Sequence, residues 1–80
     1  MNRLRLEFAT TGFLAEMRRQ WVILHPGQEC PVKALKDYPP VERSALMAAV
    51  QKAIGMTDTT ADKTFEAWQK RRAEENAEAV

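Results

Sequence analysis

The stretch VERSALMAAVQKAI, residues 41–54, carries the clearest pattern in this sequence of 80 residues. Its apolar side chains recur at the spacing of one helix face, at Leu46, Ala49, Val50, Ala53 and Ile54. Pro40 suits the first helical position, while Glu42 and Lys52 complement the charges of the two helix ends. Gly55 follows where a left-handed cap residue is expected. The stretch therefore predicts a helix that ends at Gly55.

A second helix is predicted after the turn residues 55–58, Gly-Met-Thr-Asp. Thr59 can cap this helix, and Asp62, three residues later, completes a weak capping box. Its apolar stripe consists of Ala61, Phe65 and Trp68. Residues 73–80 lack such a stripe, so we expect this tail to fray or to extend as solvated helix.

The two predicted helices are expected to close on each other across Gly55 and to form the core. Each tryptophan, Trp21 and Trp68, sits at helical spacing and is expected inside, whereas an exposed one would be a natural interface anchor. On this packing, truncating Ile54 or Phe65 to alanine removes core contacts and costs about 2–5 kcal/mol.

The N-terminal residues leave two interpretations open. Residues 3–8, Arg-Leu-Arg-Leu-Glu-Phe, alternate polar and apolar side chains, which favours a short strand with Leu4, Leu6 and Phe8 on one face. Leu4 and Phe8 also lie four residues apart, as in the first turns of a helix. We favour the strand, whose open edge would suit a partner strand.

A helix is predicted from a start signal at residues 10–12, Thr-Thr-Gly, with one apolar stripe at Phe13, Leu14, Met17, Trp21 and Leu24. Residues 21–24 fit a buried strand equally well, because they are apolar all round. The segment should end at residues 25–28, His-Pro-Gly-Gln, which suit a type II turn. Residues 30–36 predict a short helical turn that starts at Pro31.

These elements predict a mainly α fold: a small three- to four-helix domain, residues 1–80, with a short N-terminal strand at residues 3–8 as one alternative. Twelve basic and eleven acidic residues give a net charge of +1, without the positive excess of a dedicated nucleic-acid binder. The sequence has no apolar run long enough to span a membrane and no signal-peptide core. Its single cysteine fits a reducing compartment, so we expect a cytoplasmic protein.

The chain contains few candidate catalytic residues. His25 and Cys30 are the only histidine and cysteine, and a nucleophilic pair across the Pro-Gly turn is conceivable. We favour the simpler interpretation of a turn histidine and a small thiol. One cysteine and one histidine cannot complete a four-ligand zinc site, and no glycine-rich phosphate loop is present. We expect no enzyme activity, no cofactor and no metal.

Residues 44–68 partly match a DNA-binding helix-turn-helix, because Ile54-Gly55-Met56 supply its turn pattern. Gln51 and Ala61 depart from that pattern. The stretch also resembles the N-terminal helical hairpin of the HU/IHF nucleoid proteins, in residues Ala49, Ala53, Gly55, Met56, Thr57, Ala61, Lys63, Phe65 and Ala67. That resemblance implies two packed helices. It does not extend to DNA binding, because the chain lacks the β-ribbon arm with which the family grips DNA.

We therefore expect a non-enzymatic binding module, an adaptor, inhibitor or accessory protein that docks on a larger protein or complex. This profile is common among small accessory proteins of phages and mobile elements. Its candidate partner-binding residues are the two basic clusters, Arg18, Arg19, Lys70, Arg71 and Arg72. The alternative is a helix-turn-helix-like DNA-binding regulator using residues 44–72, with Thr57, Thr59, Thr60 and Lys63 facing the bases. A homodimer is compatible with either function.

Overall fold

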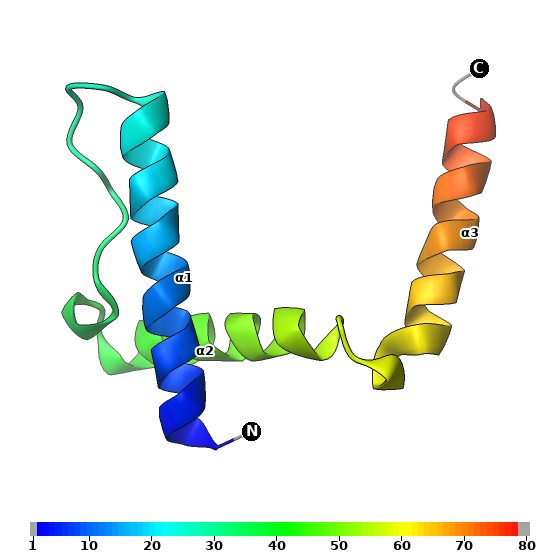
Figure 1. Ribbon diagram of the computed structural model, residues 1–80, viewed down its shortest axis with the longest axis horizontal. Helices are drawn as coiled ribbons and strands as arrows, with labels where there is room; N and C mark the ends of the chain where they lie inside the picture. Colours follow the sequence, from blue (N-terminus) through cyan, green and yellow to red (C-terminus); the bar gives the residue numbers. More distant parts are fainter. Residues whose placement is uncertain (1, 79–80) are drawn as a thin grey trace.

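The computed structural model describes residues 2–78, and over these residues the protein consists of helices and connecting segments without a strand. Three α-helices follow one another as α1 (Arg3–Leu24), α2 (Pro40–Gly55) and α3 (Asp62–Glu78). Two short 3₁₀ helices, η1 (Leu35–Asp37) and η2 (Thr59–Ala61), precede α2 and α3. Figure 1 shows an open, U-shaped arrangement, in which α2 forms the base and α1 and α3 form the two arms. The fold is small and mainly α, as predicted.

The N-terminal segment is helical, so the strand favoured for residues 3–8 is wrong. The Asn2 side chain caps α1 by accepting a hydrogen bond from the Arg5 amide at 2.7 Å. The helix buries Leu6, Thr10 and Leu14, which lie four residues apart, whereas Leu4 and Phe8 are exposed. The alternation of residues 3–8 therefore does not correspond to one buried face. Residues 21–24, for which helix and strand were equally good, also belong to α1.

The interior of α1 includes the residues that were predicted to start a helix. The hydroxyls of Thr10 and Thr11 donate to the carbonyls of Leu6 and Glu7, each at 2.8 Å, so both side chains are satisfied within the helix. Of the predicted stripe at residues 13–24, Leu14 is buried and Trp21 is partly buried. The other members, Phe13, Met17 and Leu24, are exposed. The predicted stripe is therefore buried only in part, and the buried face continues toward the N-terminus through Thr10 and Leu6.

A tight turn ends α1 at residues 25–28, as predicted. The Gln28 amide donates to the His25 carbonyl at 3.2 Å, and Gly27 has a φ of 80°, the conformation that a type II turn requires at this position. The His25 ring stacks on Trp21 with the ring centroids 4.1 Å apart. The chain then returns along α1 as an irregular segment (Figure 1). The helical turn predicted from Pro31 forms only at Leu35–Asp37.

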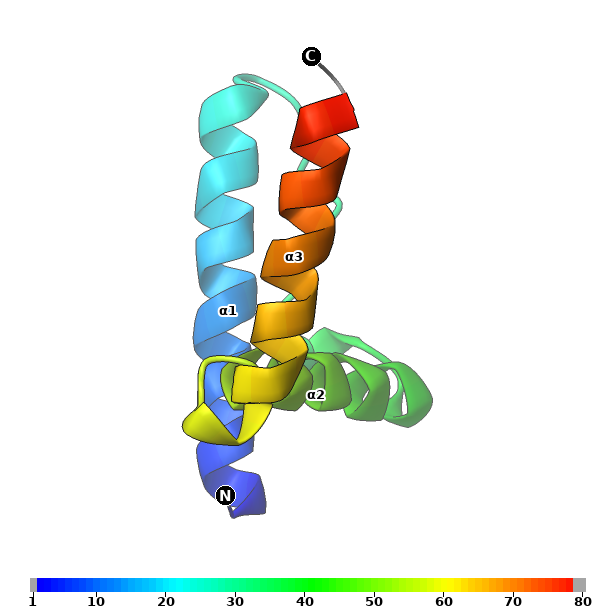
Figure 2. The ribbon, with the colours of Figure 1, turned by 90° about the vertical axis from the view of Figure 1, so that its right-hand side faces the viewer.

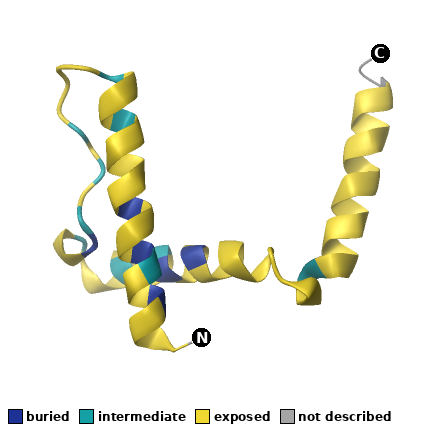
Figure 3. Cartoon of the chain, viewed as in Figure 1, coloured by how far each residue is buried: buried dark blue, intermediate teal, exposed yellow. Residues whose placement is uncertain are grey.

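The core lies where α1 crosses α2 (Figure 3). Leu6 of α1 packs there with Met47 and Val50 of α2, and Ala9 borders the cluster. Leu14 and Leu35 are buried where η1 meets α1. Within α2, Ala49 and Ala53 of the predicted stripe remain exposed and Leu46 is partly buried. The boundaries of α2 thus match the prediction, but its buried face is centred on Met47 and Val50.

The predicted packing of the two helices that flank Gly55 is wrong. Gly55 is the last residue of α2 and does not adopt a positive φ, and the cap residue Met56 is still in the right-handed region. The chain therefore does not reverse, and α3 leaves from the far end of α2 (Figures 1 and 2). The main contacts that α3 makes with another element are with the adjoining η2. The hairpin implied by the HU/IHF resemblance is accordingly absent from residues 2–78.

Because α3 leaves the core, its apolar stripe is open to solvent. Phe65 and Trp68 are each 51% exposed, and the placement of Trp68 in a core is thus wrong. Ile54, at the end of α2, is 37% exposed. The predicted start of the helix also shifts: the Asp58 side chain, in place of Thr59, caps η2 by accepting from the Thr60 amide. The tail remains helical to Glu78, and residues 79–80 lie outside the described residues.

The open shape leaves far more surface exposed than a compact chain of this size. The accessible surface is 6837 Å², whereas a folded monomer of 9.1 kDa is expected to expose about 4,900 Å². The radius of gyration is 16.7 Å, against about 12 Å expected for 80 residues. The molecule is also thin, with extents of 42 × 36 × 18 Å. Large apolar side chains such as Phe8, Phe65 and Trp68 are therefore left exposed by the fold of one chain.

Two glycine substitutions should change stability in opposite directions. Gly27→Ala is expected to destabilise the protein by about 1–2 kcal/mol, because alanine disfavours a positive φ even where nothing lies within 4 Å of the added methyl group. Gly12→Ala lies in the middle of α1, also in open space, and should stabilise the protein by about 0.5–1 kcal/mol. Urea unfolding of the two variants measures both effects. Equal effects of the two substitutions would contradict the assigned turn.

Candidate protein-docking surfaces

The first exposed surface lies on the C-terminal half of α1, and we call it the α1 patch. It surrounds a shallow hollow of about 400 Å³, lined by Ala15, Arg18, Arg19, Val22, Ile23 and Cys30. Val22 and Ile23 are more than half exposed, at 52% and 59%. They lie far along α1 from the crossing with α2, so the core does not need them. The patch combines branched apolar side chains with two arginines on a rigid helix.

Ion pairing orients one of these arginines. Arg19 donates two hydrogen bonds to the Glu16 carboxylate, at 2.6 and 2.9 Å, and Gln20 donates a third at 2.9 Å. The hydrogen bond from Arg19, followed by that from Gln20, lowers the pKa of Glu16 from 4.5 to about 2. Arg19 is thus held along the helix surface by a partner that stays ionised over the physiological range. Arg18, its exposed neighbour, supplies the other positive charge of the patch.

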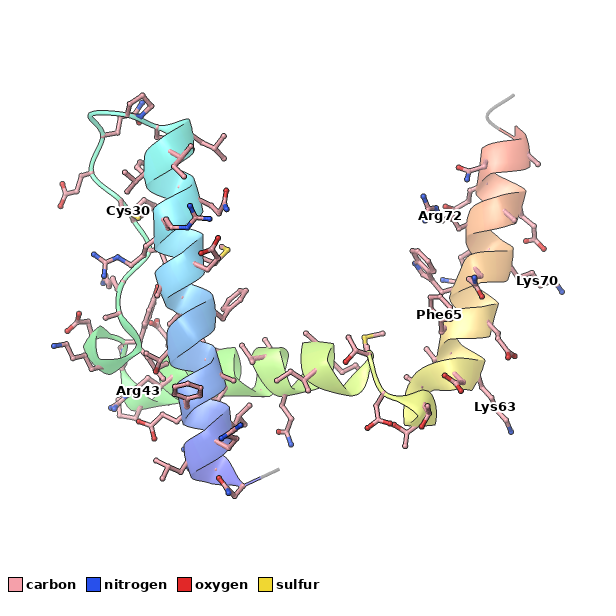
Figure 4. The ribbon with its side chains drawn as sticks, viewed as in Figure 1. Cys30, Arg43, Lys63, Phe65, Lys70 and Arg72 are labelled. Carbon is pink, nitrogen blue, oxygen red and sulfur yellow. The ribbon has the colours of Figure 1, made fainter. Side chains whose placement is uncertain are left out.

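His25 and Cys30 make their hydrogen bonds to different backbone carbonyls. The His25 Nδ1 atom lies 3.0 Å from the Trp21 carbonyl oxygen, and the Cys30 Sγ atom lies 3.7 Å from that of Val32. Cys30 lies between the returning segment and α1 (Figure 4). The conceivable nucleophilic pair is therefore not assembled. Over residues 2–78, no group of three His, Cys, Asp or Glu side chains is placed to hold a metal ion.

The second surface is an aromatic groove on α3, which we call the α3 groove. It has a volume of about 410 Å³ and is lined by Met56, Ala61, Thr64, Phe65, Ala67, Trp68 and Arg71. The rings of Phe65 and Trp68 stack, with centroids 6.1 Å apart and an interplanar angle of 21°. The Arg72 guanidinium lies 5.4 Å from the Trp68 ring centroid, a cation–π arrangement. The groove is thus apolar in the middle and basic at one end.

The basic cluster at residues 70–72 divides between two faces of α3. Arg71 lines the α3 groove and Arg72 covers Trp68. In Figure 4, Phe65 and Arg72 point toward the inside of the U, whereas Lys63 and Lys70 point away from it. The partner-binding residues predicted on α3 therefore do not form one charged surface. They also lie on a different arm from Arg18 and Arg19.

A third surface, which we call the α2 shelf, lies on the face of α2 beside the one that packs on α1. It is a hollow of about 340 Å³ lined by Tyr38, Glu42, Ala45, Leu46 and Ala49. Small alanine side chains leave room on it for large groups from elsewhere, and Glu42 places a negative charge at one end. Sequence reasoning assigned Leu46 and Ala49 to a core stripe and so did not identify this surface.

The residues predicted to read DNA bases are exposed around η2 and the start of α3. The hydroxyl of Thr57 donates to the Ile54 carbonyl at 2.6 Å, and that of Thr59 donates to the Asp58 carboxylate at 3.2 Å. Thr60 follows in the same turn, and Lys63 points away from the U (Figure 4). The Asp58 carboxylate lies among these threonines, an unfavourable neighbour for a phosphate.

None of the helices in the described part of the chain combines the length and apolar character that a membrane crossing requires. Comparisons with family models, with curated proteins and with solved structures find no match for this chain.

Proposed function

We propose that the chain is a non-enzymatic docking module, an adaptor or inhibitor that binds a larger protein through the α1 patch. The exposure of Val22 and Ile23 beside two arginines carries this proposal. Branched apolar side chains that fold no core gain free energy when a partner covers them, at roughly 25 cal/mol per Å² of apolar surface. A helix that is already rigid loses little conformational entropy when it binds.

The chemistry of the α1 patch favours a protein partner with an amphipathic, acidic segment. Apolar side chains of such a segment would cover Val22 and Ile23, while a carboxylate would face Arg18, since Arg19 is already paired with Glu16. Arginine also suits this role because its planar guanidinium pairs with carboxylates through two hydrogen bonds. The net charge of +1 favours a protein over a nucleic acid, for which broad positive surfaces supply most of the affinity.

The test is affinity capture of the tagged full chain from its source cells, with and without nuclease. We expect one protein to be recovered stoichiometrically after nuclease treatment, and Ile23→Asp to lower its recovery at least tenfold, or about 1.4 kcal/mol. Leu4→Asp is the matched control, since it makes the same kind of change at an exposed apolar residue near the other end of α1. Arg18→Glu and its charge-matched control Lys52→Glu on α2 repeat the comparison for the basic rim.

Two results would contradict the docking function. Equal losses for Ile23→Asp and Leu4→Asp would show that the α1 patch is not the binding surface. Recovery that depends on nucleic acid, with a salt-sensitive shift of a duplex by the purified chain, would instead support the DNA-binding alternative at residues 44–72.

A further inference from the structure

We propose that two copies of this chain form a dimer by exchanging α3. The aromatic face of each α3 packs on the α2 shelf of the other copy. This association goes beyond the docking function and uses other surfaces. It leaves the α1 patch of each copy free for a partner.

The spacing of the two helices matches along more than two turns. On α2, the shelf residues Glu42, Leu46 and Ala49 continue to Ala53 on the same face, with steps of four, three and four residues. On η2 and α3, the aromatic face is Ala61, the last residue of η2, followed by Phe65, Trp68 and Arg72, with the same steps. Steps of four and three residues are the repeat that keeps one seam of a helix against another.

An antiparallel pairing of the two faces produces four layers with matching sizes and charges. Large groups meet small ones in the middle, where Phe65 lies opposite Ala49 and Trp68 lies opposite Leu46. Two alanines, Ala53 and Ala61, allow close approach at one end. At the other end, the Arg72 guanidinium lies opposite the Glu42 carboxylate, so the single charged layer joins opposite charges.

The backbone between the helices favours pairing between copies over pairing within one chain. Three successive turns hold residues 56–58: the amides of Met56, Thr57 and Asp58 donate to the carbonyls of Lys52, Ile54 and Gly55. The Thr57 hydroxyl adds a bond to the Ile54 carbonyl. These bonds direct α3 away from its own α2 (Figure 1), and closing the hairpin within the chain would break them. When two copies exchange α3, α2 still pairs with an α3, and the hydrogen bonds of residues 56–58 are kept.

The exposed area is sufficient for such a dimer. Each chain exposes about 1,900 Å² more than a compact monomer of its mass. A standard protein interface covers about 800 Å² on each partner. One copy can therefore cover this interface with its excess surface alone, and the net charge of +1 per chain opposes association only weakly.

Cysteine cross-linking tests which helices pair. In a Cys30→Ser background, Ala49→Cys and Thr64→Cys place one thiol on the α2 shelf and one in the α3 groove. Exchange of α3 brings thiols of different chains into disulfide range. We expect oxidation to produce a covalent dimer in a non-reducing gel. A disulfide within one chain, or no disulfide under oxidation, would overturn the proposal.

Sedimentation velocity of the full chain tests the association itself. We expect twice the chain mass of 9.1 kDa, and Trp68→Ala to raise the dissociation constant at least thirtyfold. Lys70→Ala, on the opposite face of α3, is the matched control and should change it less than threefold (Figure 4). Arg72→Glu should weaken the dimer at least tenfold, and adding Glu42→Arg should restore most of that loss. The proposal would be overturned if the wild-type chain sedimented as a monomer at all concentrations. It would also be overturned if Trp68→Ala left the dissociation constant of the dimer unchanged.

The same measurement keeps this inference apart from the docking function. Ile23→Asp should abolish capture of the partner protein but leave the sedimenting mass unchanged, whereas Trp68→Ala should change that mass in the purified chain. If the chain sediments as a dimer but captures no partner protein, only the proposed docking function is contradicted.

Discussion

Leu6→Lys is expected to abolish folding. Leu6 is 8% exposed and packs with Met47 and Val50 at the crossing of α1 and α2, so the substitution would place an ammonium group among apolar side chains. An unpaired buried charge costs several kcal/mol, while a domain of 80 residues has a total stability of about 4–12 kcal/mol. Circular dichroism should therefore show loss of helix and of a cooperative thermal transition.

Leu4→Lys is the control for Leu6→Lys, because Leu4 lies two residues away on the same helix and is 76% exposed. This variant should fold with a stability within about 0.5 kcal/mol of the original. The contrast also separates α1 from the strand interpretation, in which Leu4 and Leu6 share one face. Equal effects of the two substitutions would contradict the observed helix.

Met47→Ala should destabilise the monomer by about 2–5 kcal/mol, since Met47 is 5% exposed and fills the centre of a small core. Phe65→Ala, measured where the chain is monomeric, should cost less than about 1 kcal/mol, because that ring has one exposed face and no core beneath it. Urea unfolding at low and high protein concentration measures both. A loss above 2 kcal/mol for Phe65→Ala in the monomer would mean that α3 packs within its own chain.

Local signals in the sequence predict where the helices begin and end better than they predict how the helices pack. The boundaries of α2 follow from Pro40 and Gly55, and the end of α1 follows from the Pro26-Gly27 turn. The start of α1 was obscured because Leu4, Leu6 and Phe8 satisfy alternation and helical spacing at once, while Asn2, the capping residue, lay outside the pattern.

Periodicity shows that a helix has an apolar face but not which neighbour covers it. The stripe of Phe65 and Trp68 was recognised correctly, yet its predicted cover within the chain is absent. On α2, the buried residue Val50 belongs to the expected stripe, whereas Met47 lies beside it, and an alanine-rich helix offers two faces of similar apolar character. The crossing of α1 decides which face of α2 is buried. The backbone conformation after Gly55 decides that α3 covers neither face within its own chain.

The candidate surfaces were partly recognisable in the same way. Arg18 and Arg19 were found from their charge, and the structure adds Val22 and Ile23 beside them. The sequence predicts residues 70–72 as one basic cluster. Consecutive residues of a helix point in different directions, however, so the Lys70 and Arg72 side chains lie on different faces of α3.

The confinement of the core to the crossing of α1 and α2 has a consequence for how this protein can change over generations. Substitutions along α3 disturb none of the buried residues Leu6, Met47 and Val50. New association preferences can therefore arise on that arm by drift and selection while the crossed helices continue to fold.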